Sequence, residues 1–547
     1  MKSSSSIVIL FISVFCYFLP ANAGIFVVTN TDDSGPGSLR QAIIEADTSA
    51  NADTILFNIP PSDPGYDPTA GVWIIQPVSA FPLIVGDSTF IDGSSQSSNQ
   101  GDTNPEGPEI EIDGTNVDES GFVIEGANNQ IFGLIINRFA EYGVGIQFSE
   151  AKNNRVAGNY IGTNANGQTA LGNILGGILI SGHADSNLVG GLSSSERNII
   201  SGTTHRGNIY QGNGVTIKGG DFNRIIGNYI GTNKDGNAAL PNTLYGVCIT
   251  YGQQNIVGGL EPGAANVISG NLYGGIFVRF TETMNNTISG NFIGTDRSGL
   301  LDLGNYVHGI YLDYGTKNNI IGPQNIIKNN GSYGIIVKND TTTGNHITQN
   351  SICNHSIRGI FIDEDANNAI PPPAILEVTD TYVSGTALSK SIVEIFSDSS
   401  DEGSVYEGTV TADVSGIFLW SGSPSGPNIS ATATDSAGNT SEFSSPYITK
   451  LEKTGHTNLL DRYRLMQNYP NPFNPITMIK YQLSMTSDVE LNVYNVRGQK
   501  VATLISEKQP KGNYEVVFDA GSLSSGIYYY CLIAADFRQT RRMLLIK

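Results

Sequence analysis

The sequence has few charged residues and little that favours long helices. Only 15% of its 547 residues are Asp, Glu, Lys or Arg, whereas 64 are glycine. Because glycine is a poor helix former, this composition argues against a helical fold and favours tightly turning strands. The chain is also longer than an ordinary single domain, so several domains are expected.

Basic residues are scarce as well. There are 30 Lys and Arg against 50 Asp and Glu, which gives a formal net charge of −20. Nucleic acids and anionic membranes attract proteins through clustered Lys and Arg, so the charge argues against both as partners. An acidic extracellular surface is sufficient to explain it.

Cysteine is nearly absent. Of the four cysteines, Cys16 lies in an apolar N-terminal stretch, and Cys248, Cys353 and Cys531 are far apart in the sequence. Three such thiols build neither a disulfide framework nor a zinc site. We interpret them as unpaired packing residues.

Long hydrophobic runs are missing except at the N-terminus. Lys2 precedes the apolar stretch from Ile7 to Leu19, and Ala21 to Ala23 resembles an AxA cleavage site. This pattern is typical of a secretory signal peptide, expected over residues 1–23. The other stretches are too short or too polar to span a bilayer, so no transmembrane segment is expected after signal removal.

The strongest positive feature is a phrase that occurs three times. Residues 159–173 read NYIGTNANGQTALGN, residues 228–242 read NYIGTNKDGNAALPN, and residues 291–305 read NFIGTDRSGLLDLGN. Each period of 63 to 69 residues holds two short GIxI-like strands. These strands begin at Ile146, Ile178, Val215, Val247, Ile276, Ile310, Ile335 and Ile360. Short strands repeated at this spacing predict a solenoid, in which each unit buries its apolar face against its neighbours.

An asparagine recurs eight to ten residues after each strand start. Side-chain amides stacked in successive coils can bond to one another at the ~4.8 Å spacing of paired strands. We therefore predict one amide ladder, with the IGTN and GGL inserts as loops. The ladder comprises Asn129, Asn154, Asn187, Asn223, Asn255, Asn286, Asn319 and Asn345.

The coils from about Phe122 to Asp365 resemble the right-handed parallel β-helix of pectate-lyase-like surface proteins. The expected fold class is all-β: a right-handed parallel β-helix solenoid, then an immunoglobulin-like β-sandwich and a small C-terminal β-sandwich. The resemblance implies a fold and no single activity, because that group includes lyases, hydrolases, adhesins and passive passenger domains.

The domain boundaries follow from changes in pattern. Residues 24–120 are expected to form an N-terminal cap and first coils, including a helix capped by Ser38 in a segment that resembles the SLRQAI opening of bacterial β-helices. Residues 121–372 form the β-helix. Residues 373–448, with SATATDSAGNTSEFS near their end, resemble bacterial immunoglobulin-like modules. A polar linker is expected over residues 449–464.

The C-terminal segment carries the most specific motifs. Residues 467–483 read QNYPNPFNPITMIKYQL, followed by VELNVYNVRGQKVATL, SGIYYYCL and a closing RRMLLIK. These motifs closely resemble the type A sorting domain of the type IX secretion system, expected over residues 465–547. The resemblance implies that the type IX machinery is a partner and that the protein is secreted to the outer cell surface or the medium.

A candidate site lies on the first sheet of the solenoid. If the GIxI residues point inward, alternation turns Phe277, Tyr311, Ile336 and Phe361 outward in one column, and Arg279, Asp313, Lys338 and Asp363 in the next. Aromatic rings beside charged groups form a candidate carbohydrate-binding face. Stacked aromatics and opposite charges also stabilise a sheet by themselves, so the structural interpretation stays open.

The sequence assigns no catalytic residue. Asp313 and Asp363 lie two coils apart, ~9.6 Å at the usual strand spacing, whereas inverting hydrolases separate their carboxylates by about 6.5 to 9.5 Å. Gly182 and His183 supply half of a GHG motif, and no RIK follows. Asp363, Glu364 and Asp365 offer a Ca²⁺ site, although no cofactor is required. Asn233, Asp235, Asp296 and Ser298 of the inserts fit turn chemistry better than a cation loop.

These observations favour a non-catalytic carbohydrate-binding or adhesive module, whose partner is a polysaccharide or cell-surface glycan. The alternative is a polysaccharide lyase or glycoside hydrolase that acts on an acidic polysaccharide at the same face.

Overall fold

A computed structural model describes residues 24–49, 51–205, 211–363, 365–449, 463–466, 468, 471, 473–535 and 537–546. The chain divides into two compact units, Met1–Thr449 and Lys450–Lys547. The predicted signal peptide, residues 1–23, lies outside the described residues. Within the described part, no helix is both long and apolar enough to cross a membrane.

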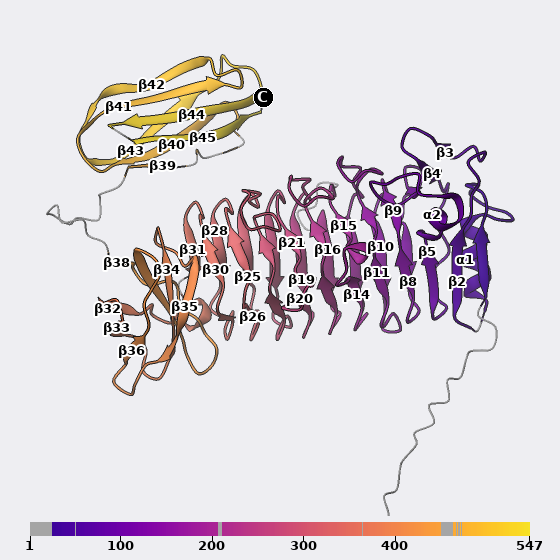
Figure 1. Cartoon of the computed structure of the whole chain (residues 1–547), viewed down its shortest axis with the longest axis horizontal. Helices are drawn as coiled ribbons and strands as arrows, with labels where there is room; N and C mark the ends of the chain where they lie inside the picture. Colours follow the sequence, from indigo (N-terminus) through magenta and orange to yellow (C-terminus); the bar gives the residue numbers. More distant parts are fainter. Residues whose placement is uncertain are drawn as a thin grey trace, which may run out of the picture. The chain divides into compact units, whose positions relative to one another are not determined.

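The first unit contains a parallel β-helix, in which three sheets run along one axis (Figure 1). Strands from successive coils pair in parallel, and β3 with β4 is the antiparallel exception in these sheets. This confirms the predicted all-β fold with long parallel sheets. Sheet A consists of β1 (Ile25–Val28), β2 (Asp53–Phe57), β5 (Thr89–Asp92), β8 (Gln130–Phe132), β11 (Arg155–Ala157), β14 (Leu188–Gly190), β17 (Arg224–Ile226), β20 (Ile256–Gly258), β23 (Thr287–Ser289), β26 (Ile320–Ile321) and β29 (His346–Ile347).

The second and third sheets complete each coil. Sheet B consists of β3 (Tyr66–Asp67), β4 (Val72–Ile75), β6 (Ile110–Asp113), β9 (Leu134–Asn137), β12 (Tyr160–Ile161), β15 (Ile199–Ile200), β18 (Tyr229–Ile230), β21 (Val267–Ile268), β24 (Phe292–Ile293), β27 (Ile326–Lys328) and β30 (Ser351–Cys353). Sheet C consists of β7 (Phe122–Ile124), β10 (Tyr142–Gln147), β13 (Gly176–Ser181), β16 (Asn213–Lys218), β19 (Tyr245–Thr250), β22 (Gly274–Arg279), β25 (His308–Asp313), β28 (Tyr333–Val337) and β31 (Arg358–Ile362).

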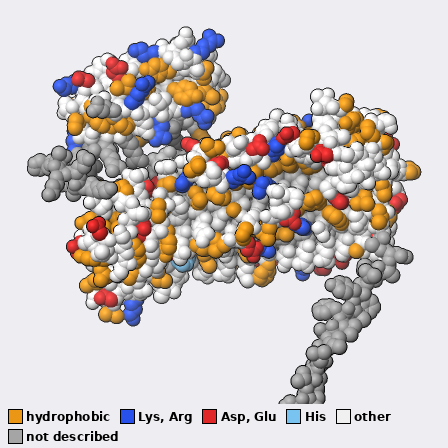
Figure 2. All heavy atoms as spheres, viewed as in Figure 1, with side chains coloured by type: hydrophobic (Ala, Val, Ile, Leu, Met, Phe, Trp, Pro, Cys, Tyr) orange, Lys and Arg blue, Asp and Glu red, His pale blue; other side chains and the backbone are white. Residues whose placement is uncertain are grey.

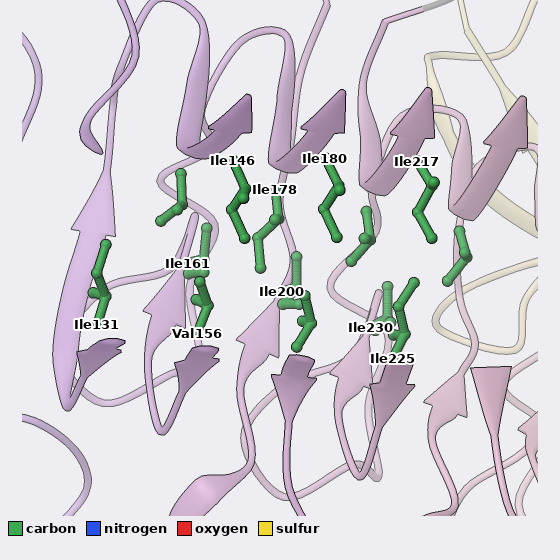
Figure 3. Packing of buried hydrophobic residues seen from close by; sticks show 14 of the residues in the cluster. Ile131, Ile146, Val156, Ile161, Ile178, Ile180, Ile200, Ile217, Ile225 and Ile230 are labelled. Atoms are coloured by element: carbon green, nitrogen blue, oxygen red, sulfur yellow. The ribbon is translucent and has the colours of Figure 1, made fainter. Parts of the chain in front are cut away.

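The interior is a column of aliphatic side chains contributed by all three sheets. Ile178 of sheet C and Ile200 of sheet B lie in one coil and Ile225 of sheet A lies in the next, all fully buried (Figure 3). Each such side chain contributes roughly 1.5–3 kcal/mol of hydrophobic stabilisation relative to exposure. The predicted strand starts pair in register from Ile178 onward, but Val144, rather than Ile146, pairs with Ile178.

The predicted asparagine ladder is confirmed, and it is one of three. In the predicted ladder, Oδ1 of each asparagine accepts the backbone N–H of the asparagine one coil earlier, as between Asn187 and Asn223 at 2.8 Å. A second ladder lies between sheets A and B, and a third between sheets B and C. The second comprises Asn159, Asn198, Asn228, Asn266, Asn291, Asn325 and Asn350, and the third Asn242, Asn271, Asn305 and Asn330.

The IGTN inserts are turns closed by their own side chains, as predicted. Oδ1 of Asn233 accepts the backbone N–H groups of Asn237 and Ala238. Asp296 accepts those of Leu300 and Leu301 at the same place in the next copy. Burial opposes ionisation of Asp296, but these donors and the Ser298 hydroxyl together lower its pKa to about 2. These oxygens are therefore engaged within the turns.

Among the described residues, two α-helices and two 3-10 helices accompany the coils. Helix α1 (Leu39–Asp47) is capped by Ser38, whose Oγ accepts the N–H of Gln41, as predicted. Helix α2 (Ser95–Gln100) was not predicted, because its segment resembles a coil in sequence. The 3-10 helices are η1 (Ser194–Glu196) and η2 (Ala366–Ala369). The sheets already begin at Ile25, so α1 accompanies the first coil.

Still within the first unit, an antiparallel two-sheet domain follows the last coil. Its sheets contain β32 (Ala374–Val378), β33 (Tyr382–Thr386) and β36 (Ile417–Ser421), and β34 (Ile392–Asp398), β35 (Val405–Thr411), β37 (Asn428–Thr434) and β38 (Tyr447–Ile448). Its acidic side chains hold the last coil: Glu394 accepts the Gln349 N–H at 2.9 Å, and Glu402 lies 3.2 Å from His355 Nδ1. The closer resemblance to immunoglobulin modules stays a prediction.

The second unit is a small antiparallel sandwich. Its sheets contain β39 (Arg464–Leu465), β40 (Ile476–Leu483) and β43 (Gly512–Asp519), and β41 (Ser487–Asn495), β42 (Lys500–Gln509), β44 (Gly526–Ala534) and β45 (Phe537–Leu545). Tyr481, Tyr530 and Leu532 are buried between them. Residues 450–462 of the predicted linker lie outside the described residues. The three cysteines of the described part are unpaired and buried, as predicted.

Candidate functional site

The predicted site residues lie on the outer face of sheet C. Phe277 pairs with Tyr311, Tyr311 with Ile336, and Ile336 with Phe361 in successive strands. Tyr311 and Phe361 are half-buried, but Phe277 is only 6% exposed and Ile336 only 1%. The expectation of open rings is therefore wrong for Phe277, because neighbouring side chains cover it.

The covering residues are aromatic, and Tyr245, His308 and Tyr333 among this aromatic cluster were missed in the sequence. The Phe277 ring stacks between Tyr245 and Tyr311, with centroids 4.8 and 4.7 Å away. Tyr333 stacks on Phe361 at 4.9 Å, and Tyr333 also lies against His308. Tyr245, His308 and Tyr333 stand two residues before the inward-pointing GIxI position, where period-two alternation would turn them inward, so the sequence contained no signal for this outward cluster. We call these rings the inner cluster: Tyr245, Phe277, His308, Tyr311, Tyr333 and Phe361. Their faces contact one another and cover this part of the outer face of sheet C.

Asp313 lies on this face and holds neighbouring groups in place by accepting their hydrogen bonds. Only 3% of it is exposed. Its Oδ2 accepts the Tyr311 hydroxyl, and its Oδ1 accepts the Tyr314 N–H at 2.7 Å and the side-chain amide of Asn339. Both Asp313 oxygens are thus engaged within the protein, which disfavours Asp313 and Asp363 as the carboxylate pair of an inverting hydrolase.

The neighbouring charges remain near the surface. The Arg279 guanidinium lies over the rings of Phe280 at 4.3 Å and Phe277 at 5.3 Å. Lys338 and Asp363 are half-buried where β28 and β31 end. Figure 2 shows hydrophobic side chains, tyrosine included, interspersed with acidic and basic ones over the first unit.

Two titratable groups of the inner cluster, His308 and Tyr311, are neutral near pH 7. Burial, reinforced by the Lys338 charge, lowers the pKa of His308 to about 4. Burial, followed by the hydrogen bond to Asp313, raises the pKa of Tyr311. His308 is therefore an uncharged imidazole, and Tyr311 keeps its hydroxyl proton.

A second aromatic column, also missed in the sequence, follows the ends of the sheet C strands. The residue after each of β10, β13, β16, β19, β22 and β25 has a left-handed backbone, as has Asn339 beyond β28. These residues are Phe148 (φ 72°), Gly182 (68°), Gly219 (78°), Tyr251 (57°), Phe280 (77°), Tyr314 (55°) and Asn339 (68°). Glycine and asparagine tolerate this conformation, whereas a bulky aromatic residue there is strained. We call this set the left-handed column.

Three aromatic residues of the left-handed column form a continuous stack. The Tyr251 and Phe280 rings are 4.9 Å apart and nearly parallel, and Phe280 lies 5.5 Å from Tyr314. Tyr251 is 42% exposed and Tyr314 52%. Because the rings stack along the solenoid axis, solvent reaches their edges and the outer faces of the two end rings.

The described residues contain no group of three His, Cys, Asp or Glu side chains placed to hold a metal ion. Glu364, the central residue of the predicted Ca²⁺ site, lies outside them. A site formed by Asp363, Glu364 and Asp365 therefore stays a prediction.

Comparison with known proteins supports the export signal. Residues 467–547 match the family described as a secretion system C-terminal sorting domain. This confirms the predicted sorting segment, so the protein is a type IX secretion cargo, found at the cell surface or outside the cell. No curated protein matches the sequence.

Two solved structures are similar to parts of this chain at low scores. One is dimeric latent PorU from Porphyromonas gingivalis, at 12% identity and a TM-score of 0.17 over 34% of this chain and 22% of that one. The other is the PL6 family polysaccharide lyase Pedsa3628 from Pseudopedobacter saltans, at 11% identity and a TM-score of 0.24 over 61% of this chain and 77% of that one. At these values neither neighbour indicates a function for this chain.

Proposed function

We propose that this secreted, cell-surface protein is a carbohydrate-binding or adhesive module that holds glycans along the outer face of sheet C, at the edge where its strands end. The observation that carries the proposal is the strained stack of Tyr251, Phe280 and Tyr314. Unfavourable backbone conformations cost about 1–3 kcal/mol each and concentrate at functional sites. Three of them in consecutive coils keep aromatic rings at the solvent edge, where glycine would be unstrained.

The chemistry of this edge suits sugars. Aromatic rings offer apolar surface to the C–H faces of a pyranose, and tyrosine adds a hydroxyl at the rim. Arg279 lies against the stack, and Lys338 follows β28, two coils away from Arg279. These cations supply hydrogen-bond donors for hydroxyl or carboxylate groups of a bound glycan. Partly exposed rings beside cations retain a polymer without enclosing a reacting bond.

The state of the polar groups favours binding over catalysis. Both Asp313 oxygens accept hydrogen bonds from the protein, and His308 is neutral and largely covered. The alternative, a polysaccharide lyase or glycoside hydrolase that acts on an acidic polysaccharide, draws support from one observation. Arg279 and Lys338 flank Asp313 along one column and place two cations where uronate carboxylates would bind.

The test is binding and turnover with the full secreted protein. It is incubated with neutral and acidic glycans while retention, new reducing ends and unsaturated products are measured. We expect retention without products, and its loss when Tyr251, Phe280 and Tyr314 are all replaced by Ala. Tyr306→Ala is the control, because Tyr306 is 46% exposed and lies outside the left-handed column. Product formation would establish the enzyme, and no retention of any glycan would refute both functions.

A further inference from the structure

Two glycines interrupt the aromatic residues of the left-handed column between Phe148 and Tyr251. Along the solenoid the column runs from Phe148 through Gly182 and Gly219 to Tyr251, and the stack then continues without interruption. The register is fixed by the backbone, because the Gly182 N–H donates to Lys218 O at 3.2 Å and the Gly219 N–H to Thr250 O at 2.8 Å. Gly219 therefore occupies the coil directly before Tyr251, where the next ring of the stack would stand.

The two glycines differ in what surrounds them. Beside Gly182, the Phe148 ring reaches across: its Cδ1 lies 3.6 Å from the position of a β-carbon on Gly182. Around the same position on Gly219, no heavy atom lies within 4 Å, its chain neighbours aside. The gap in the column is therefore at Gly219, and the Gly182 coil is already covered by Phe148.

Aromatic surface borders this gap on both sides. One face of the Tyr251 ring rests on Phe280, so its other face is turned toward the Gly219 coil, and 42% of the residue is exposed. Phe148, 56% exposed, borders the far side. The coils of Gly182 and Tyr251 are two strand spacings apart, ~9.6 Å. A ring held between two others in van der Waals contact needs about 7 Å.

We propose that the gap over Gly219 is a binding subsite for a single pyranose ring, which completes the column between Tyr251 and Phe148. This inference rests on the proposed carbohydrate binding and locates it. The rim is polar: the exposed Lys218 ends β16, and the exposed His183 is tied to the glycine by its N–H, which donates to Gly219 O at 3.0 Å. Both side chains can bond to sugar hydroxyls while the ring stacks on Tyr251.

Filling the gap tests the subsite. Gly219→Tyr places a protein ring where the sugar ring would bind, and the column already holds Tyr251 and Tyr314 in the same backbone conformation. Gly219→Asn is the matched control, because Asn339 occupies this position in a later coil with a small side chain. In the full secreted protein, methyl glycosides of glucose, galactose, mannose and N-acetylglucosamine, together with glucuronic and galacturonic acids, are tested by saturation-transfer difference NMR.

We expect at least one of these monosaccharides to bind the wild type, with at least tenfold weaker binding to Gly219→Tyr and binding within threefold of wild type for Gly219→Asn. Equal binding by Gly219→Tyr would overturn the subsite. If Gly219→Tyr does not fold, Tyr251→Leu removes one wall instead, and unchanged binding by that variant would also overturn it. Glycan retention that depends on Tyr314 but not on residue 219 would leave the proposed function standing without this subsite.

Discussion

Oδ1 of Asn255 accepts two hydrogen bonds from Asn223, one from its backbone N–H at 2.8 Å and one from its side-chain amide at 3.1 Å. Asn223 repeats this arrangement toward Asn187, so each amide serves as acceptor for one coil and donor to the next. Both residues are fully buried. The ladder thereby satisfies a turn that has no access to water.

Replacing one rung tests this role. Asn223→Leu removes the acceptor for two Asn187 donors, and each buried unsatisfied group costs about 1–3 kcal/mol. We expect the free energy of unfolding to fall by roughly 2–5 kcal/mol in denaturant titrations. Asn166→Leu, at an exposed turn position, is the control and should change it by less than about 1 kcal/mol. An equal effect of both substitutions would leave the ladder without a role in stability.

Asp313 should stabilise the fold because its carboxylate oxygens accept hydrogen bonds, rather than because it is charged. Asp313→Ala removes the acceptor for Tyr311, Tyr314 and Asn339, which predicts a loss of roughly 2–4 kcal/mol of unfolding free energy. Asp313→Asn keeps one carbonyl oxygen and should lose about half as much. Denaturant unfolding measures both. If Asp313→Asn keeps its stability yet abolishes a glycan-cleaving activity, Asp313 is catalytic and its positioning role is insufficient.

The lowered pKa of His308 predicts that the folded protein loses stability at acid pH. Its pKa is lowered to about 4 by burial and by Lys338, against 6.5 for an unperturbed histidine. The unfolded chain therefore binds the proton more tightly, and stability falls as pH decreases from 6.5 toward 4, by up to about 3 kcal/mol. His308→Phe should flatten this part of the stability profile, measured by unfolding at a series of pH values. An unchanged profile would show that folding leaves the pKa of His308 near its value in the unfolded chain.

The raised pKa of Glu394, at the end of the solenoid, predicts the opposite dependence of stability on pH. Burial raises its pKa above 4.5, although Thr348 and the Gln349 N–H partly counteract this. The folded state then holds the proton more tightly, so the Glu394 contribution to stability decreases as pH rises above 4.5. Glu394→Gln should remove this decrease, and its stability relative to wild type should grow between pH 4.5 and neutrality. A constant difference between the two proteins would contradict the shift.

A substitution at Tyr314, the exposed end of the aromatic stack, can distinguish an effect on glycan binding from an effect on stability. Tyr314→Asn keeps a residue that tolerates the left-handed backbone, so the thermal midpoint should change little. Loss of the end ring should weaken glycan binding by about tenfold, which corresponds to roughly 1.4 kcal/mol. Calorimetry with a glycan retained by the wild type gives both quantities. Tyr306→Asn is the matched control, and equal losses in both variants would remove the special role of the column.

The sequence by itself determined the solenoid, the ladder of Asn223 and Asn255, and the export signal at residues 467–547. The first two follow from periodicity: coils stack in parallel, so residues at equal places in the repeat must meet. The export signal is a local motif that needs no tertiary contact to be read.

Only the tertiary structure decided what the outer face of sheet C offers. Alternation placed Phe277 and Asp313 on that face, but their burial depends on Tyr245, Tyr311 and Asn339 reaching across from neighbouring strands. The left-handed backbone at Tyr251, and the open space at Gly219 beside it, arise from the turn conformation at each strand end. Side-chain direction and the sign of φ are set by packing between coils. The sequence repeat does not contain this information.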